Sequence, residues 1–332
     1  MTEKKAKIKA LGLSSGGLDS ILAGVVLQHL GIDVEWVSFE TPFFNAEKAK
    51  QAAKDTGIFL YVKQITEKYL PMLLSPNAGY GKHMNPCKDC HALMFRLAGE
   101  IMAEIGASFL FSGEVVGQRP MSQTMSSLRY VEKHSGMEGY ILRPLSAQIL
   151  PETIVEKKGW VARGKLYGFS GRSRKPQMTL AEKFGIKTYP TPGGGCLLTE
   201  EKYAKRLRDL FAHQDTYPEK QLELLQFGRH LRIEPKAKLI VGRTQAENEQ
   251  IKSRCDLQTD MLFKTIGFPG PTAILSGGTT KEEVLNKCAA ICAGYSKGYQ
   301  EKEVSVEVFS SSGKQILNVV PMPPLNIQAY LL

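Results

Sequence analysis

Short apolar runs alternate with longer helical segments over the first third of the chain, and this alternation limits the fold more than any other feature. Segments with the length and composition of strands lie at residues 8–13, 34–39, 58–62 and 108–111. Segments with helical spacing of apolar residues or helical composition lie at residues 20–30, 45–56 and 91–105. Strands that alternate with helices of this length predict βαβ units. We therefore expect an α/β fold with a doubly wound parallel sheet, whose ligands bind beyond the carboxyl ends of the strands.

The hexapeptide Ser15-Gly16-Gly17-Leu18-Asp19-Ser20 stands between the first predicted strand and the first predicted helix. Its two glycines permit a sharp turn that brings backbone N–H groups close to a ligand. The helix that follows presents the positive end of its dipole, which favours an anion. Asp19 would suit a phosphate only if it held Mg²⁺. The loop has neither the lysine of a Walker A motif nor the spacing of a dinucleotide loop, so we predict a distinct type of phosphate loop.

The hexapeptide matches the S-G-G-x-D-S signature, and the chain thereby resembles the PP-loop family of ATP pyrophosphatases. The resemblance implies that ATP binds this loop, that it is cleaved between its α- and β-phosphates with Mg²⁺, and that an acceptor is adenylated. The family includes amidating, nitrile-forming, lysidine-forming and tRNA-thiolating enzymes. The loop alone therefore leaves the reaction open.

A second segment, residues 111–124, follows the strand at 108–111 and should reach the same edge of the sheet. Its polar side chains, among them Glu114 and Gln118, could bind adenosine or position an anionic intermediate. The segment is similar to the G-E-x-x-G-Q-x-x-S-Q-T stretch of tRNA 4-thiouridine synthases. Arg143-Pro144-Leu145 resembles the R-P-L element of the same family. Together the two elements favour tRNA thiolation among the PP-loop reactions.

Three cysteines form the next candidate site. Cys87 and Cys90 make a C-x-x-C at the start of a predicted helix, where thiol pKa values are lowered and metals can be bound, and Cys196 follows three glycines. Three thiols could hold an iron–sulfur cluster with one iron left open. The residues also permit a structural zinc site that adds His91, a persulfide pair that includes Cys196, or a purely structural role.

The family resemblance favours the cluster. PP-loop thiolating enzymes that use a [4Fe–4S] cluster carry a C-x-x-C and one distant cysteine, which implies that Cys87, Cys90 and Cys196 are the ligands. The run Asn85-Pro86-Cys87, followed by Cys90, also resembles tRNA 2-thiouridylases, whose second active cysteine would correspond to Cys196. The other three cysteines, Cys255, Cys288 and Cys292, are assigned to the core.

The charge balance favours a polyanionic partner. The chain has 43 Lys and Arg against 33 Asp and Glu, a net charge of +10. A basic stretch between residues 157 and 176 carries Tyr167 and Phe169 between its charges, a pattern that suits contact with an RNA backbone and with bases. The residues predicted to contact RNA are Arg143, Arg163, Lys165, Arg172, Arg174 and Lys175.

We place a domain boundary near residue 200, so that residues 1–200 form the PP-loop catalytic domain and residues 201–332 a smaller α+β domain. Residues 227–233, 238–243 and 246–248 resemble an RNA-associated domain of the NFACT-R type. Its basic residues could follow a phosphate backbone, where they would release counterions. These residues are Arg229, His230, Arg232, Lys236, Lys238 and Arg243.

Together these observations predict ATP-dependent insertion of sulfur into a tRNA uridine, with Mg²⁺ on Asp19 and free sulfide or a persulfide carrier as sulfur donor. The predicted ATP-binding residues are Ser14, Ser15, Gly16, Gly17, Leu18, Asp19, Ser20, Ser112, Gly113, Glu114 and Gln118. A small-molecule PP-loop synthetase with structural zinc and a non-catalytic nucleotide- or RNA-binding protein are the alternatives. A polar N-terminus and the lack of a long apolar run predict a cytosolic protein that has no membrane partner. The oligomeric state is open.

Overall fold

The structure is a computed structural model that describes residues 8–191, 195–277 and 281–332. It divides into two compact units, Met1–Cys196 and Leu197–Leu332, which are described separately. Gly193 and Gly194 of the predicted glycine run lie outside the described residues. In the described part of the chain, no helix combines the length and the apolar character needed to cross a membrane.

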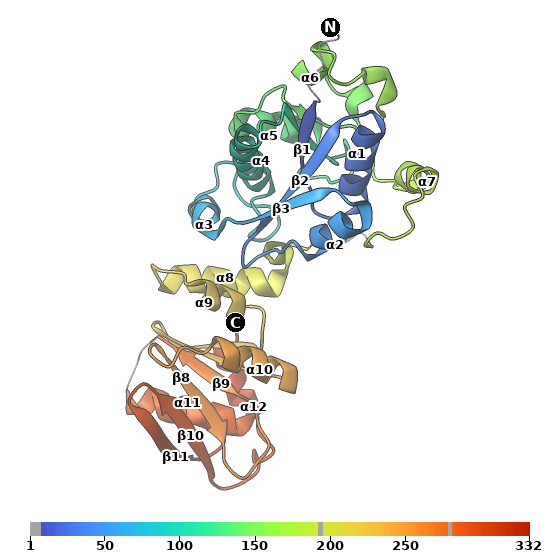
Figure 1. The fold of residues 1–332 in the computed structure, drawn as a ribbon. Coiled ribbons are helices and arrows are strands. Elements are labelled where there is room, and N and C mark those ends of the chain that lie inside the picture. The colour runs from blue at the N-terminus through green and yellow to red at the C-terminus, as the bar shows by residue number, and fades with distance from the viewer. Residues whose placement is uncertain (1–7, 192–194, 278–280) are drawn as a thin grey trace. The chain divides into compact units, whose positions relative to one another are not determined.

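The N-terminal unit is built on a parallel sheet with the strand order β3-β2-β1-β4-β5 (Figure 1). Its strands are β1 (Lys9–Leu13), β2 (Asp33–Glu40), β3 (Phe59–Gln64), β4 (Phe109–Ser112) and β5 (Ile141–Leu142). The chain moves outward from β1 to β3 and then returns to the other side of β1 with β4. The strand order therefore reverses between β1 and β4, and in such sheets this switch point is where ligands bind. The predicted doubly wound α/β fold is confirmed.

Helices cover both faces of this sheet, with α1, α2 and α7 on one side and α3, α4 and α5 on the other (Figure 1). The helices are α1 (Leu18–His29), α2 (Glu47–Thr56), α3 (Thr66–Leu74), α4 (Cys87–Glu104), α5 (Met125–Ser135), α6 (Ile154–Lys157) and α7 (Lys175–Lys183), with short 3₁₀ turns η1 (Ala147–Ile149) and η2 (Arg163–Lys165). The three helices predicted in this unit correspond to α1, α2 and α4, while α3, α5, α6 and α7 were not predicted. Pro71 interrupts the pattern of α3. Helix α5 begins directly after the segment 111–124, whose last residue, Thr124, caps it by accepting the Ser127 N–H at 3.1 Å.

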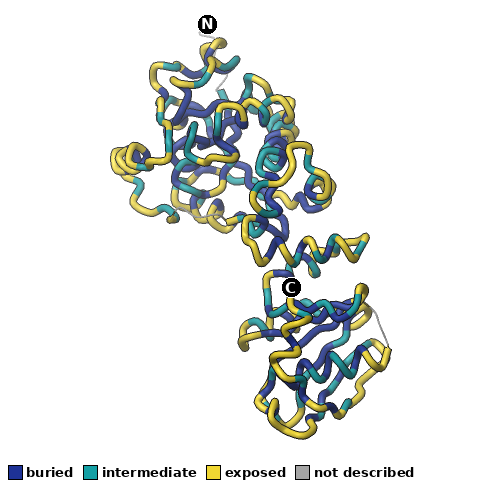
Figure 2. Tube along the Cα trace, turned by 180° about the vertical axis from the view of Figure 1, so that it is seen from behind, coloured by how far each residue is buried: buried dark blue, intermediate teal, exposed yellow. Residues whose placement is uncertain are grey.

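The core of the N-terminal unit packs α1 against the sheet. Leu18, Leu22 and Trp36 are fully buried, and Figure 2 shows the buried segments running through the middle of the unit. Gly12 faces Phe111 across the β1–β4 pair. A Cβ on Gly12 would lie 2.2 Å from the Phe111 ring, so this position of β1 accepts no side chain while the ring stays in place.

The C-terminal unit contains an antiparallel sheet with the strand order β11-β10-β8-β9-β7-β6. Its strands are β6 (Arg229–Glu234), β7 (Ala237–Val241), β8 (Asp260–Thr265), β9 (Ala273–Ser276), β10 (Val304–Ser310) and β11 (Gly313–Val319). Its helices are α8 (Glu201–His213), α9 (Glu219–Leu224), α10 (Gln245–Arg254), α11 (Glu282–Gly294) and α12 (Pro324–Ile327), with 3₁₀ turns η3 (Leu197–Thr199) and η4 (Gln328–Tyr330). The predicted smaller α+β domain is confirmed.

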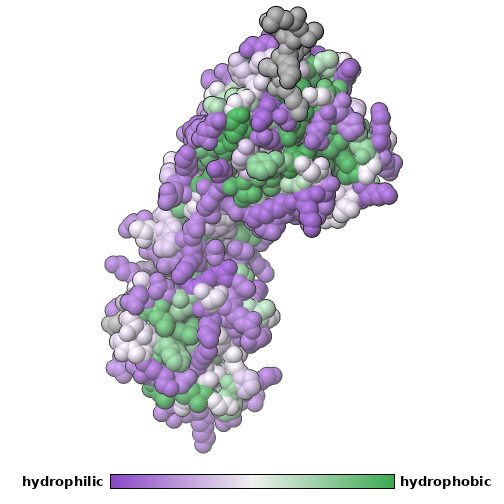
Figure 3. Space-filling view, in the orientation of Figure 1, coloured by the Kyte–Doolittle hydropathy of each residue, from purple (hydrophilic) through white to green (hydrophobic). Residues whose placement is uncertain are grey.

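The apolar face of α11 forms the main core of this unit with the sheet. Cys288 and Cys292 lie in that core and are buried, in agreement with their assignment. A second hydrophobic cluster is formed by other residues of the strands together with Leu224 of α9 and Ile251 of α10. Polar residues cover most of the surface of this unit in the view of Figure 3, with smaller apolar patches between them.

Candidate active site

The phosphate loop connects β1 to α1 at the switch point of the sheet. Gly16 has a φ of +70°, a conformation that favours glycine, and a Cβ there would meet the backbone of Lys48 at 2.1 Å. The helix begins after Gly17, which supplies no side-chain cap. Among the described residues, the N–H groups of Leu18, Asp19 and Ser20 have no hydrogen-bond acceptor. These unpaired donors, at the positive end of the helix, form a site for an anion.

The loop after β4 lies directly against the phosphate loop. A Cβ on Gly113 would lie 2.3 Å from the Asp19 carbonyl and 2.4 Å from the Ser20 nitrogen, so only glycine permits this approach. Gln118 of the same loop donates from Nε2 to Asp19 Oδ2 at 2.7 Å. The structure thus brings the two predicted ATP-binding segments together, although they are about a hundred residues apart.

The Asp19 carboxylate has one oxygen available for a ligand. Its Oδ1 is buried and lacks a hydrogen-bond partner among the described residues. Burial raises the pKa of Asp19, while the hydrogen bond from Gln118 and the charges of Arg174 and Arg119 act to lower it. A buried carboxylate oxygen without a partner suits a hard cation such as Mg²⁺.

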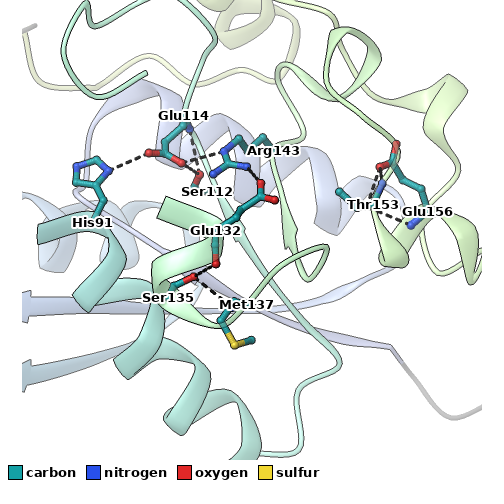
Figure 4. Close-up of polar contacts among 9 residues, drawn as sticks. All are labelled: His91, Ser112, Glu114, Glu132, Ser135, Met137, Arg143, Thr153 and Glu156. Carbon is teal, nitrogen blue, oxygen red and sulfur yellow. Dashed lines mark hydrogen bonds and ion pairs between the residues drawn. The ribbon is translucent and has the colours of Figure 1, made fainter. Parts of the chain in front are cut away.

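Glu114 is the centre of a buried polar network (Figure 4). Its Oε1 contacts His91 Nδ1 at 2.9 Å, and its Oε2 accepts from Arg143 Nε at 3.0 Å and from the Ser112 hydroxyl at 3.1 Å. Arg143 also pairs with Glu132 of α5. Burial alone would raise the pKa of Glu114, but Arg143 and His91 outweigh it and lower this pKa to about 2. Glu114 is therefore an ionised structural anchor between β4, α4 and the segment after β5.

The buried position of Arg143 contradicts one of our sequence-based predictions. It was expected to contact RNA, but its side chain is 2% exposed and lies between Glu114 and Glu132. The R-P-L element therefore supports the loop after β4 from inside the protein. A buried arginine that is paired with two carboxylates is unavailable to a phosphate backbone.

The C-x-x-C occupies the first turn of α4. The predicted helix started at His91, but the observed one begins at Cys87, after Pro86. The Asn85 amide donates to Cys87 Sγ at 3.2 Å, and its carbonyl oxygen accepts the His83 N–H at 3.2 Å. The Asp89 carboxylate, between the two cysteines, accepts from the Ala78 N–H at 2.8 Å and from the Tyr130 hydroxyl at 2.7 Å. These contacts fix the turn that carries both thiols.

Cys196 lies near this turn. Burial raises the pKa of the Cys90 thiol, contrary to the lowering expected at a helix start, and the charges of Cys196 and Cys87 act in the same direction. The Tyr69 hydroxyl of α3 acts to lower the pKa of Cys90, although its contact is too loose to count as a hydrogen bond. Cys87 and Cys90 thus share one turn, and Cys196 is close enough to Cys90 for its charge to act on that thiol.

Within the ranges the structure describes, no group of three or more His, Cys, Asp or Glu side chains is arranged to hold a metal ion. The donor set formed by the three thiols has the chemistry of an iron–sulfur site. His91, the fourth ligand of the zinc alternative, instead directs Nδ1 to Glu114. This contact links the cysteine turn to the loop that packs on Asp19.

The basic stretch between residues 157 and 176 is only partly a surface feature. Lys165, Arg172 and Lys175 are exposed. Arg163 donates to Glu156 at 2.7 Å and to the Leu150 carbonyl at 2.8 Å, and Arg174 is half-buried. The two aromatic residues expected between the charges, Tyr167 and Phe169, pack against the core, so they are not stacking surfaces for bases.

The basic residues predicted on the C-terminal unit differ in their exposure. His230 is 1% exposed and Lys238 is 3% exposed. Arg232 and Lys238 both pair with Asp209, and Arg243 pairs with Glu247. His230 and Lys238 therefore cannot follow a phosphate backbone as predicted, because β6 and β7 direct them into the protein. Lys236 and Arg243 are exposed.

Sequence reasoning missed several residues of this site. Gln177 of α7 donates to Gln118 at 2.9 Å, and Tyr69 faces the cysteines from α3. Neither residue lies in a motif, and both belong to helices that were not predicted. Asp89 and His91 adjoin the cysteines in sequence, but their contacts depend on segments distant in the chain.

Comparison with known families supports the class of protein that this fold and site define. Residues 6–156 match the family described as thiamine biosynthesis protein (ThiI), and residues 228–331 match the NFACT protein RNA binding domain. The first match covers β1, the phosphate loop, the cysteine turn and the loop after β4. Residues 6–156 are therefore similar to the ThiI family, in agreement with the resemblance of their motifs to PP-loop thiouridine synthases. A segment similar to the NFACT RNA binding domain follows.

Individual relatives and solved structures are similar to parts of this chain. Probable tRNA sulfurtransferases of Staphylococcus aureus strains Newman and JH1 are each 27% identical over 159 residues, which is 45% of this chain and 37% of the relative. The match thus spans little more than a third of the length of these relatives. Among solved structures, a 4-thiouridine synthetase–RNA complex with bound ATP is 23% identical over 54% of this chain and 51% of that chain, with a TM-score of 0.35. A predicted subunit of tRNA methyltransferase from Methanocaldococcus jannaschii is 21% identical over 41% and 69%, with a TM-score of 0.31.

Proposed function

We propose that the protein uses ATP to insert sulfur into a uridine of tRNA through an adenylated intermediate. The observation that carries this proposal is the contact between His91 and Glu114. It connects the cysteine turn of α4 to the loop whose Gly113 packs on Asp19. This contact supports the proposal because it makes the thiols neighbours of the proposed nucleotide site, as an enzyme that both activates and sulfurates one substrate requires.

ATP would place its phosphates on the N–H groups of residues 18–20, in the field of the α1 dipole. Mg²⁺ would be held by Asp19 Oδ1, which is buried and unpaired among the described residues. The uridine carbonyl oxygen attacks the α-phosphorus, the bond to the bridging oxygen breaks, and pyrophosphate leaves. The phosphate loop stabilises the charge on this leaving group.

Sulfur would then reach the activated carbon from the cysteines. Sulfide would add to that carbon, and AMP would depart with the former carbonyl oxygen. Cys87, Cys90 and Cys196 would be the ligands of a [4Fe–4S] cluster, which would supply an iron for binding this sulfide. Free sulfide would serve directly as the donor, whereas a persulfide carrier would serve together with a thiol reductant that releases its outer sulfur as sulfide.

The tRNA would be held by the C-terminal unit, whose family is described as RNA-binding. The exposed residues Lys165, Arg172 and Lys175 of the N-terminal unit are further candidate contacts with the phosphate backbone. The net charge of +10 is consistent with this partner. A protein with these substrates would act in the cytoplasm, where tRNA is modified.

The test is an anaerobic reaction of the protein with tRNA, ATP, Mg²⁺ and sulfide, followed by mass spectrometry of the nucleosides. Cys87→Ser, Cys90→Ser and Cys196→Ser should each abolish the thiolated nucleoside, while Cys288→Ser in the C-terminal core should retain it. Absorbance near 400 nm of the anaerobically purified protein tests the cluster separately. Formation of pyrophosphate without tRNA, with no thiolated product, would instead favour a small-molecule synthetase.

A further inference from the structure

The segment that leads into α7 packs on the loop after β4. The Gly171 N–H donates to the Val116 carbonyl at 2.8 Å. The Ser146 hydroxyl accepts the Val116 N–H at 3.1 Å and donates to the Phe169 carbonyl at 2.7 Å. Because Val116 lies between Gly113 and Gln118, these bonds hold the start of α7 beside the nucleotide loops.

Two glutamines connect α7 to Asp19. Gln177 Nε2 donates to Gln118 Oε1 at 2.9 Å, and Gln118 Nε2 donates to Asp19 Oδ2 at 2.7 Å. Gln177 is 0% exposed, yet its Oε1 is buried without a hydrogen-bond partner in the described ranges. Leaving such an atom unpaired is costly, and a ligand that donates a hydrogen bond or a cation would remove the cost.

Arg174 lies one turn before Gln177 and is also incompletely paired. Its Nε is buried and has no hydrogen-bond partner among the described residues. It is close enough to Asp19 for its charge to act on that carboxylate. A half-buried guanidinium beside unpaired backbone N–H groups and a carboxylate oxygen suits a phosphate group with its metal ion.

We infer that Arg174 and Gln177 of α7 complete the nucleotide site, Arg174 as a ligand of the triphosphate and Gln177 as a positioning residue that orients Gln118 on Asp19. This inference rests on the proposed function, because it takes ATP to be the ligand of the phosphate loop. It removes Arg174 from the set of RNA contacts. It also gives the site a third segment, in addition to the loops after β1 and β4.

The test measures binding of a non-hydrolysable ATP analogue with Mg²⁺ to the full chain by calorimetry, without turnover. Arg174→Gln should weaken binding by about tenfold or more, since hydrogen bonds to charged groups contribute of this order. Lys183→Gln removes the same charge from the exposed end of the same helix and should leave the affinity unchanged. Gln177→Met, which keeps the side chain's size, should weaken the analogue with Mg²⁺ more than the analogue with EDTA, whereas a merely structural role would affect both equally.

Binding of tRNA to the same variants separates the two roles of Arg174. Weaker tRNA binding with unchanged affinity for the analogue would place Arg174 in the RNA interface and overturn the inference. Unchanged analogue affinity in Arg174→Gln and Gln177→Met, with melting temperatures close to wild type, would also overturn it. If the wild-type protein binds the analogue but forms no thiolated nucleoside, the proposed reaction fails while the role of α7 stands.

Discussion

Replacing Glu114 with glutamine should destabilise the N-terminal unit by about 3 kcal/mol at neutral pH. The carboxylate is 7% exposed and bonds to Arg143, His91 and Ser112. Its pKa is lowered from the ordinary 4.5 to about 2. A lowered pKa means that the folded state favours the ionised form, and a lowering of this size corresponds to about 3 kcal/mol. The loss of one partner from a buried ion pair costs a similar amount.

Both tryptophans of the chain, Trp36 and Trp160, lie in the N-terminal unit, so their fluorescence in urea reports on that unit alone. The matched control is Glu100→Gln on α4, whose pair with Lys68 is exposed and should contribute below about 1 kcal/mol. Because the folded pKa lies below the unfolded one, the stabilisation is complete above about pH 5 and declines as the pH falls toward 2. The difference between wild type and Glu114→Gln should therefore shrink from about 3 to about 2 kcal/mol between pH 7 and pH 3.5. A difference at pH 7 no larger than that of the control, or one that grows at low pH, would refute the reasoning.

Further measurements test other parts of the structure. In Gly113→Ala the new Cβ would lie 2.3 Å from the Asp19 backbone, so this variant should bind the ATP analogue at least about tenfold more weakly. Gly164→Ala is the control, because its position has open space around it and its affinity should not change. Equal affinities of the two variants would contradict the close approach of the two loops. Burial raises the pKa of Cys288 and Cys292 to about 12, so iodoacetamide at pH 8 should label them only after unfolding. Rapid labelling of these two cysteines in the native protein would show that α11 is not packed as described. Burial lowers the pKa of Lys238 to about 8, so its charge costs stability that is recovered as the pH rises. Relative to Lys238→Met, the wild-type C-terminal unit should gain about 2 kcal/mol between pH 7 and pH 10 in circular-dichroism unfolding curves, and a flat difference would argue against a buried charged amine.

Local sequence signals were sufficient to predict those parts of the fold and the site that depend on residues close together in the chain. The strand before Ser14, the helix after Gly17 and the C-x-x-C at a helix start follow from periodicity and from the preferences of glycine and proline. The parallel sheet followed from the alternation of strands and helices. That two separate loops meet at the switch point could be predicted because parallel strands end at the same edge.

Pairing between distant residues could not be predicted in the same way. Arg143 looks like a basic residue of a motif, and nothing in its vicinity shows that Glu114, 29 residues earlier, shares its pocket. In the C-terminal unit, alternation along β7 directs Lys238 inward to Asp209, although its charge suggests a surface position. Composition can estimate the total charge, but only the fold determines which charges reach solvent.

The contact between Gly12 and Phe111 has a consequence for how this sequence can diverge. Since the ring fills the space that a side chain at position 12 would occupy, each residue restricts what the other can become. Homologues that carry alanine or a larger residue at position 12 should have replaced the aromatic ring at position 111 with something smaller. An alignment of ThiI-type domains should therefore show these two positions changing together, even though neither residue takes part in the chemistry.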